Sequence, residues 1–268
     1  MIASKALPPI GATITKQSKF IRKILNKIAG KKLLESFGGR LRFFGIGGAG
    51  ISKYVEQFLI EAEFPYIVGY GLTETAPLLA GSVLGDKIRP HSTGIAMAGV
   101  ELKIRNKDPK TGNGEIIAKS PSVMMGYYKD EEQTAEVIED GWFLTGDLGY
   151  IDEDGYLFIN GRSKNVLIGK GGENIYPEQI EATINQQNGV LDSLVMHKNE
   201  QLIAKVHLDY ELLDEDDRED VEKLLEDMRK DVNTQVSLFS KILKFVEQKE
   251  EFVKTPTKKI KRYLYTEK

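Results

Sequence analysis

The sequence has 268 residues, enough chain for roughly two domains that each bury a core. Its formal net charge is only −3, with 37 basic and 40 acidic residues, so no overall field favours nucleic acid as a partner. Cys is absent, which excludes thiol nucleophiles and cysteine zinc sites, and the three histidines are too scattered to form a metal centre. Since no uncharged apolar run reaches membrane-spanning length, we expect a soluble, cytoplasmic protein.

The first segment is basic and predicts an amphipathic helix. No acidic residue precedes Glu35, and five apolar side chains fall on one helical stripe: Phe20, Ile21, Ile24, Leu25 and Ile28. We favour packing of this stripe against its own domain, with the lysines facing water. Contact with a membrane surface, or a role as a transit peptide, stays open.

Strand-like and helix-like segments then alternate, which predicts a mixed α/β fold. A buried strand is expected at 41–45 and a second at 66–70. Between them we expect a helix whose apolar face carries Val55, Phe58 and Leu59. From 93 to 160 short strands alternate with Gly, Asp and Pro turns, which indicates a β-rich subdomain. Its strands are expected at 102–105, 115–118, 149–152 and 156–160.

A different unit follows Arg162, so we predict domains at 1–162 and 163–268. Its helix after Pro177 should turn Ile180 and Ile184 inward, and one longer helix should span 214–233. We also expect a glycine loop at 169–172 and four strands, at 166–168, 194–197, 202–208 and 242–248.

Three polar positions in the first domain suit a nucleotide. Tyr70 ends a strand and offers a flat face to a base, Thr73 offers a hydroxyl to phosphate, and Glu74 offers one carboxylate to Mg²⁺. Asp147 is expected on a turn, where it either accepts both hydroxyls of a ribose or caps its own turn. From the residues alone, we consider the capping role the stronger of the two for Asp147.

In the second domain, Arg162 can fork onto ribose or phosphate oxygens, or pair with a surface carboxylate. The glycine loop at 169–172 either admits a narrow ligand or is a flexible connector. The basic segment 255–262 is either a solvated tail or the source of one lysine that neutralises a developing anion.

The order and spacing of these motifs carry more information than any one of them. They are a Gly-Gly turn at 47–48, Tyr-Gly-x-Thr-Glu at 70–74, Val-Met-x-Gly-Tyr at 123–127, Gly-Trp-Phe-x-Thr-Gly-Asp at 141–147, Gly-Arg-x-Lys at 161–164, Gly-x-Asn-Ile-x-Pro-x-x-Ile-Glu at 172–181 and Pro-Thr-x-Lys-Ile at 256–260. Over residues 38–262 the chain resembles the adenylate-forming superfamily of acyl-CoA synthetases, luciferases and peptide-synthetase adenylation domains. Within it, the chain looks most like the C-terminal half of a long-chain fatty acid–CoA ligase.

The resemblance implies a fold, a reaction and a set of ligands. The fold is the end of an AMP-binding domain with its β-rich subdomain, followed by a small mobile α+β lid. In such enzymes a carboxylate attacks ATP, with Mg²⁺, to give acyl-AMP, and coenzyme A then displaces AMP. The fatty acid, CoA and the N-terminal portion of the domain would be the partners of this chain.

The family's functional residues transfer to this chain position by position. Adenine would lie beside Gly47, Gly48, Ala49 and Tyr70, phosphate by Thr73, and Mg²⁺ at Glu74. Asp147 would hold the ribose with help from Arg162. Lys259 would act at the α-phosphate, Lys164 would be the hinge, and the pantetheine of CoA would pass Gly171 and Gly172.

The sequence also departs from the family. It lacks the Ser/Thr/Gly-rich phosphate loop ending in Pro-Lys-Gly, it has Gly50-Ile51 where Pro-Leu is common, and Lys258 replaces the commoner glycine before Lys259. We therefore expect this chain alone not to turn over. Two alternatives stay open: an adenylation unit that loads a carrier-protein phosphopantetheine, and a non-catalytic module acting on a partner or membrane.

Overall fold

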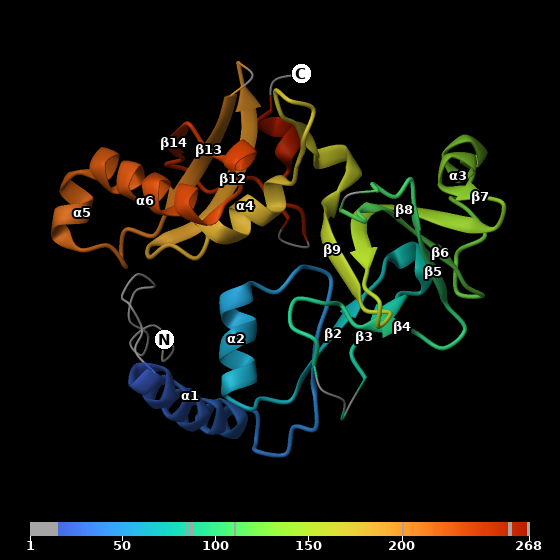
Figure 1. Ribbon diagram of the computed structural model, residues 1–268, viewed down its shortest axis with the longest axis horizontal. Coiled ribbons are helices and arrows are strands. Elements are labelled where there is room, and N and C mark those ends of the chain that lie inside the picture. The colour runs from blue at the N-terminus through green and yellow to red at the C-terminus, as the bar shows by residue number, and fades with distance from the viewer. Residues whose placement is uncertain are drawn as a thin grey trace. The chain divides into compact units, whose positions relative to one another are not determined.

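The computed structural model describes residues 16–83, 85, 88–109, 111–199, 201–256 and 259–266 (Figure 1). Residues 1–15, the start of the predicted basic segment, lie outside this description. The chain divides into two compact units between Ile159 and Asn160, close to the expected boundary after Arg162. Among the described residues, no helix is long and apolar enough to cross a membrane.

The first unit begins with α1 (Lys16–Ser36), which lies against α2 (Lys53–Glu61). The predicted helix is confirmed, but the expected packing of its apolar stripe is wrong. The stripe faces outward, with Phe20 67% and Ile28 53% exposed. Polar groups make the contact instead: the Arg22 guanidinium and the Asn26 amide both donate to the Glu61 carboxylate.

The face predicted for α2 is correct in part. Leu59 is buried and Phe58 packs against the core, as predicted, but Val55 is 43% exposed and the carboxylate residue Glu56 is buried instead. Glu56 is tolerated there because the Tyr66 hydroxyl and the His91 backbone N–H donate to it. A count of apolar residues at helical spacing does not reveal such polar partners.

A four-stranded sheet runs in the order β1-β2-β3-β4, made of Phe44–Ile46, Tyr66–Tyr70, Ala80–Gly81 and Ile95–Ala96. The strand expected at 66–70 is confirmed residue for residue, while β1 starts three residues later than the predicted 41–45. β1 and β2 are parallel, and the other pairs are antiparallel. Leu59, Phe64, Tyr66 and Val68 form the core between this sheet and the helices.

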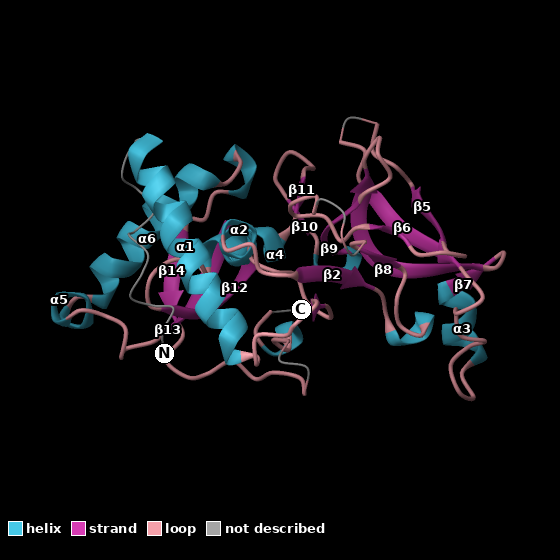
Figure 2. Ribbon diagram, turned by 90° about the horizontal axis from the view of Figure 1, so that it is seen from below, coloured by secondary structure: helices cyan, strands magenta, loops and turns pink. Residues whose placement is uncertain are grey.

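The β-rich subdomain is a five-stranded antiparallel sheet of order β5-β6-β8-β7, with β9 also paired to β8. Its strands are β5 (Glu101–Arg105), β6 (Gly114–Lys119), β7 (Ile138–Glu139), β8 (Trp142–Ile151) and β9 (Leu157–Arg162). The helix α3 (Glu131–Val137) lies beside β7 and β8 (Figure 2). Ile116, Ala118 and Leu157 are fully buried in its core. The strands predicted at 102–105, 115–118 and 156–160 are close to β5, β6 and β9, whereas the strand predicted at 149–152 is the end of the longer β8.

The second unit is a three-stranded sheet covered on both faces. Its strands are β12 (Val190–Lys198), β13 (Gln201–Leu208) and β14 (Lys244–Glu247), and a short hairpin of β10 (Leu167–Ile168) and β11 (Asn174–Ile175) precedes them. Alternate residues of β12 point to opposite faces: Val195 joins the core under the helices, while Leu194 and Met196 join the core under the C-terminal segment.

The helices of this unit are α4 (Pro177–Ile184), α5 (Glu215–Glu219) and α6 (Val221–Gln235). Pro177 occupies the first turn of α4, and Ile180 and Ile184 are buried, as predicted. The single helix predicted at 214–233 is wrong, because the chain breaks at Asp220, which leaves helical geometry at φ −129°, ψ 69°. The Asp220 side chain then accepts a hydrogen bond from the Lys223 N–H, which caps α6.

Candidate functional site

The first candidate site lies at the carboxyl ends of β1 and β2. These strands are parallel, with Phe44 beside Tyr66 and Ile46 beside Val68, so their ends reach the same edge of the sheet. The exposed loop Gly47, Gly48, Ala49 leaves β1 at this edge, and its turn uses a positive φ of 80° at Gly48. Tyr70 ends β2 one residue before Gly71. A crevice at such an edge is where open α/β sheets bind ligands.

Tyr70 and Asp147, which stand 77 positions apart in the sequence, meet below this edge. The Tyr70 hydroxyl donates a 2.7 Å hydrogen bond to Oδ2 of Asp147. Both residues are buried, at 9% and 6% exposure. A carboxylate this deep needs donors to offset its lost hydration, and the phenol is one of them.

A bulge in β8 aims Asp147 at Tyr70. Asp147 was predicted on a turn, but it lies within the ten-residue strand β8. The pairing to β6 shifts register here: Glu115 lies opposite Leu148 and Ile117 lies opposite Leu144, so extra residues of β8 face Ile116.

Two details explain this local geometry and the prediction's failure. Gly146 takes φ +69°, a conformation that favours glycine. The Thr145 hydroxyl donates to the Ile116 carbonyl and accepts from the Asp147 N–H. The glycine and polar residues that resemble a turn are the residues that a bulge needs. Asp147 lies in a strand rather than on the predicted turn, and it accepts a hydrogen bond from Tyr70.

Thr73 and Glu74 lie on a short 3₁₀ turn directly after β2 (Thr73–Thr75). Thr73 is exposed and Glu74 is half-buried. The Tyr127 hydroxyl donates to Oε1 of Glu74 at 3.0 Å, and the Met124 N–H donates to the Glu74 carbonyl at 2.8 Å. Tyr127 belongs to the quoted Val-Met-x-Gly-Tyr motif, yet the sequence alone gave it no role.

The donor set at Glu74 fits a Mg²⁺ that keeps water and phosphate ligands rather than one enclosed by protein. Glu74 supplies one carboxylate. Among the described residues, no three or more His, Cys, Asp or Glu side chains lie close enough together to bind a metal ion. Mg²⁺ is commonly held by one or two carboxylates together with substrate phosphates. Water and phosphate oxygens would have to complete the coordination of such an ion.

The second unit holds the other predicted residues. Arg162 ends β9 and is half-buried, and Lys164 is exposed on the 3₁₀ turn Ser163–Asn165. The amide of the adjacent Asn165 donates at 2.6 Å to Oε1 of Glu178 on α4. The turn that carries Lys164 is thus tied to the first helix of this unit.

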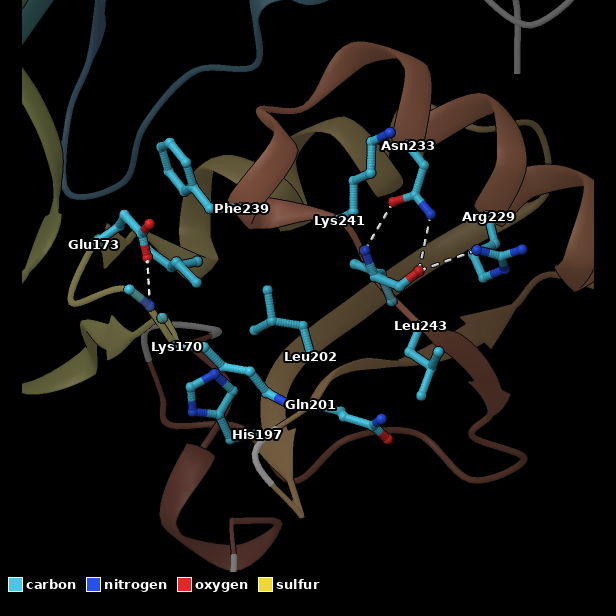
Figure 3. Close-up of a pocket in the computed structure, with 14 residues that line it drawn as sticks. Lys170, Glu173, His197, Gln201, Leu202, Arg229, Asn233, Phe239, Lys241 and Leu243 are labelled. Carbon is cyan, nitrogen blue, oxygen red and sulfur yellow. Dashed lines mark hydrogen bonds between the residues drawn. The ribbon is translucent and has the colours of Figure 1, made fainter.

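The glycine loop connects β10 and β11 and borders a cavity of about 500 Å³ (Figure 3). Glu173 shapes the loop, since its side chain accepts from the Gly171 N–H and its carbonyl accepts from the Gly169 N–H. Gly172 holds φ +85°. The far wall is built by Leu202, Phe239 and the 241–243 segment, and the cationic side chains at the cavity are Lys170, Arg229 and Lys241, with His197 beside them.

Lys259 lies near the C-terminus in the segment 254–262, which we call the Lys259 loop. A β-bridge joins Lys254 to Ile260, the Thr255 N–H donates to the Lys259 carbonyl, and the Lys259 N–H donates to the Thr255 hydroxyl at 3.1 Å. The Lys259 side chain is exposed. Thr257 and Lys258 lie outside the described residues.

Comparison with known proteins agrees with the motif order. Residues 6–128 match the family model described as AMP-binding enzyme. Over these residues the chain is similar to the AMP-binding, adenylate-forming superfamily. In this superfamily it resembles the AMP-forming acid–thiol ligases.

Two curated relatives and one solved structure illustrate the likeness. The 2-succinylbenzoate–CoA ligase of Listeria innocua is 35% identical over 175 residues, 63% of this chain and 36% of that protein. The long-chain-fatty-acid–CoA ligase of Bacillus subtilis is 37% identical over 136 residues, 48% of this chain and 24% of that protein. O-succinylbenzoate coenzyme A synthetase (MenE) of Bacillus subtilis, solved in complex with AMP, shares the fold with a TM-score of 0.73 at 23% identity, over 94% of this chain and 53% of that one.

The chain thus spans about a third or less of the length of these curated relatives and about half of the solved chain. The mixed α/β architecture of this chain matches part of the fold of that solved structure.

Proposed function

We propose that this chain supplies the AMP-holding edge and the mobile lid of an ATP-dependent acyl-CoA synthetase. The observation that carries the proposal is the buried Tyr70–Asp147 pair at the shared carboxyl edge of β1 and β2. A carboxylate that contacts the residue at the end of a parallel strand pair is suited to hold two ribose hydroxyls. The Gly47–Ala49 loop then borders the adenine, whose face Tyr70 approaches.

The adenylation step needs groups that hold phosphate and offset its growing charge. We assign Thr73 to the phosphate and Glu74 to the Mg²⁺ that accompanies it, with Tyr127 orienting the Glu74 carboxylate. Lys259 supplies a positive charge to the α-phosphate as the carboxylate of the acid attacks and pyrophosphate leaves. Arg162 assists at the ribose.

Thioester formation uses another face of the same lid. The second unit turns at Lys164 and replaces the Lys259 loop by the glycine loop, whose backbone at Gly171 and Gly172 lines a passage for the pantetheine of CoA. The thiol then attacks the acyl carbonyl and AMP leaves. Two chemically different steps over one site explain why a rigid lid with two working faces is useful.

The test is a calorimetric titration of the chain with AMP and with a non-hydrolysable acyl-AMP analogue. We expect weak binding that Asp147→Ala abolishes, and no acyl-CoA from the chain alone, since its sequence lacks the phosphate loop. The exposed Asp154, at 64% side-chain exposure, provides the matched control as Asp154→Ala. Binding that survives Asp147→Ala, or acyl-CoA formed by the pure chain, would refute the assignment.

For the acid we propose a long-chain fatty acid, a choice supported by the motif around Lys259 and by the 37% identical long-chain relative. An aromatic acid is the second candidate, because a 2-succinylbenzoate–CoA ligase is 35% identical over a longer stretch. Titrations with an alkyl-AMP and an aryl-AMP analogue distinguish these candidates. Tighter binding of the alkyl analogue would support a fatty acid, and tighter binding of the aryl analogue an aromatic acid.

A further inference from the structure

The Lys259 loop is fixed at both ends by ion pairs to other elements of its unit. On one side, Nζ of Lys254 lies 2.6 Å from Oδ2 of Asp192, a residue of β12. On the other side, the Arg262 guanidinium contacts the carboxylate of Glu181 on α4. Lys259 stands between these two anchors. Both pairs are shielded from water, with side-chain exposures of 25% or less in all four residues.

The Glu181–Arg262 pair also completes the edge of the sheet. β12 is an edge strand, so at Val195 its outward backbone groups need partners. The Val195 N–H donates to Oε1 of Glu181 at 2.7 Å, and the Arg262 guanidinium donates to the Val195 carbonyl at 3.5 Å. Arg262 thereby joins the C-terminal segment to the edge of β12 and to α4 at one point.

Glu178 extends the network towards the turn that carries Lys164. Its Oε1 lies 3.9 Å from the Arg262 guanidinium and accepts the hydrogen bond from Asn165. One helix, α4, therefore presents carboxylates to both segments that the proposed lid chemistry uses: the turn of Lys164 and the loop of Lys259.

We propose that Glu181 and Arg262 are positioning residues for Lys259, and that their ion pair fixes the Lys259 loop to α4 so that hinge and lysine move as one body. The role given to Lys259 rests on the proposed function, whereas the anchoring itself does not. Breaking the pair should free the loop while leaving the core beneath α4 intact, since that core is built from Ile180, Ile184 and other apolar side chains.

Burial raises the pKa of Glu181 to about 7, against the lowering effect of Arg262 and of the Val195 N–H. Measurements should therefore be made at about pH 8, where Glu181 is mostly ionised. The readout is backbone amide hydrogen exchange in the whole chain without nucleotide, followed at the loop amides of Thr255, Lys259 and Lys261. Each of these amides donates a hydrogen bond that closes the loop.

In Glu181→Gln and in Arg262→Met we expect these amides to exchange about tenfold faster, with α6 unchanged. The double variant should be accelerated by less than the product of the two single effects, because both substitutions remove the shared Glu181–Arg262 contact. Arg262→Lys should restore much of the protection by keeping a cation at the carboxylate. Glu226→Gln, which breaks the surface Arg229–Glu226 pair on α6, is the matched control and should leave the loop unchanged.

Loop amides that stay slow in both single variants would overturn the proposal. So would equal acceleration across α6, which would mark the pair as a general support of the fold, or additive effects in the double variant. The AMP titration is a separate measurement: fast loop amides together with absent AMP binding would reject the proposed function and leave the anchor standing.

Discussion

At the scale of single residues, the Tyr70–Asp147 contact is the most informative feature, because burial makes each partner depend on the other. Replacing Tyr70 by Phe keeps the ring but removes one donor from a buried carboxylate. We expect a loss of about 1–3 kcal/mol in unfolding free energy, measured by urea denaturation, together with weaker binding of the AMP analogue.

Tyr128→Phe is the control for that change. Its side chain is 88% exposed, so the same loss of a hydroxyl should leave stability and binding as they were. Equal stability of Tyr70→Phe and the parent chain would show that the phenol contributes nothing to holding Asp147.

The residue scale also shows what the sequence does and does not reveal. The motif resemblance predicts Tyr70, Glu74 and Asp147 in one nucleotide site; the structure brings Tyr70 and Asp147 into contact, and their roles stay a prediction. The partners that orient these groups were not predicted, because Tyr127 and Thr145 act through tertiary contacts between segments far apart in the chain. Periodicity and spacing carry no record of such contacts.

At the scale of elements, Gly146 in the β8 bulge has two separable effects: its positive φ contributes to stability, and the bulge directs Asp147 towards Tyr70. Gly146→Ala places a Cβ on a residue with φ +69°, which should cost about 1 kcal/mol of stability. It should also turn Asp147 away from Tyr70 and reduce affinity for the AMP analogue, measured by calorimetry.

Gly155 offers the comparison, since it has φ +85° in the turn between β8 and β9 and open space around its Cα. Gly155→Ala should cost similar stability and keep full affinity. If both variants bind the analogue equally well, the bulge does not aim Asp147.

Elements were predicted well where one face is apolar and badly where polar contacts decide. The strand at Tyr66–Tyr70 and the helix of Ile180 and Ile184 follow their hydrophobic spacing. In α1 that spacing misled, since the apolar stripe is exposed and Glu61 supplies the docking contact. The break between α5 and α6 depends on one cap at Asp220, which competes with a continuous helical pattern.

At the scale of the molecule, α1 is joined to the first unit by a carboxylate, so its docking should depend on pH. Burial alone would raise the pKa of Glu61, but hydrogen bonds from Arg22, Gln57 and Asn26 outweigh it and hold the pKa below its ordinary value. A lowered pKa means that the stabilisation is present above the ordinary pKa of about 4.5 and is lost as the pH falls through the folded-state value.

We therefore expect amides of α1 to exchange faster, after correction for intrinsic rates, when the pH is lowered from about 6 to about 3. Glu61→Gln should show fast exchange at both values, because it cannot gain the negative charge that Arg22 pairs with. The exposed neighbour Glu63, 60% exposed beside Lys27, gives the control as Glu63→Gln, which should keep the dependence on pH. A pH-independent α1 in the parent chain would contradict this account.

The two units have separate apolar cores, and this predicts how damage to one is contained. Ile184 is fully buried in the core that α4, α6 and the three-stranded sheet share, and the cores of the first unit are built from other residues. Ile184→Ala should cost the second unit about 2–5 kcal/mol through lost burial and the cavity left behind. Amide exchange should therefore accelerate in β12 and β13 but not in β6 and β8.

Leu59→Ala, in the first unit, should give the reverse pattern: exchange should accelerate in β2 but not in β12 and β13. Acceleration of both units by either variant would mean that they unfold as one cooperative body, and a hinge at Lys164 would then have to work against that cooperativity.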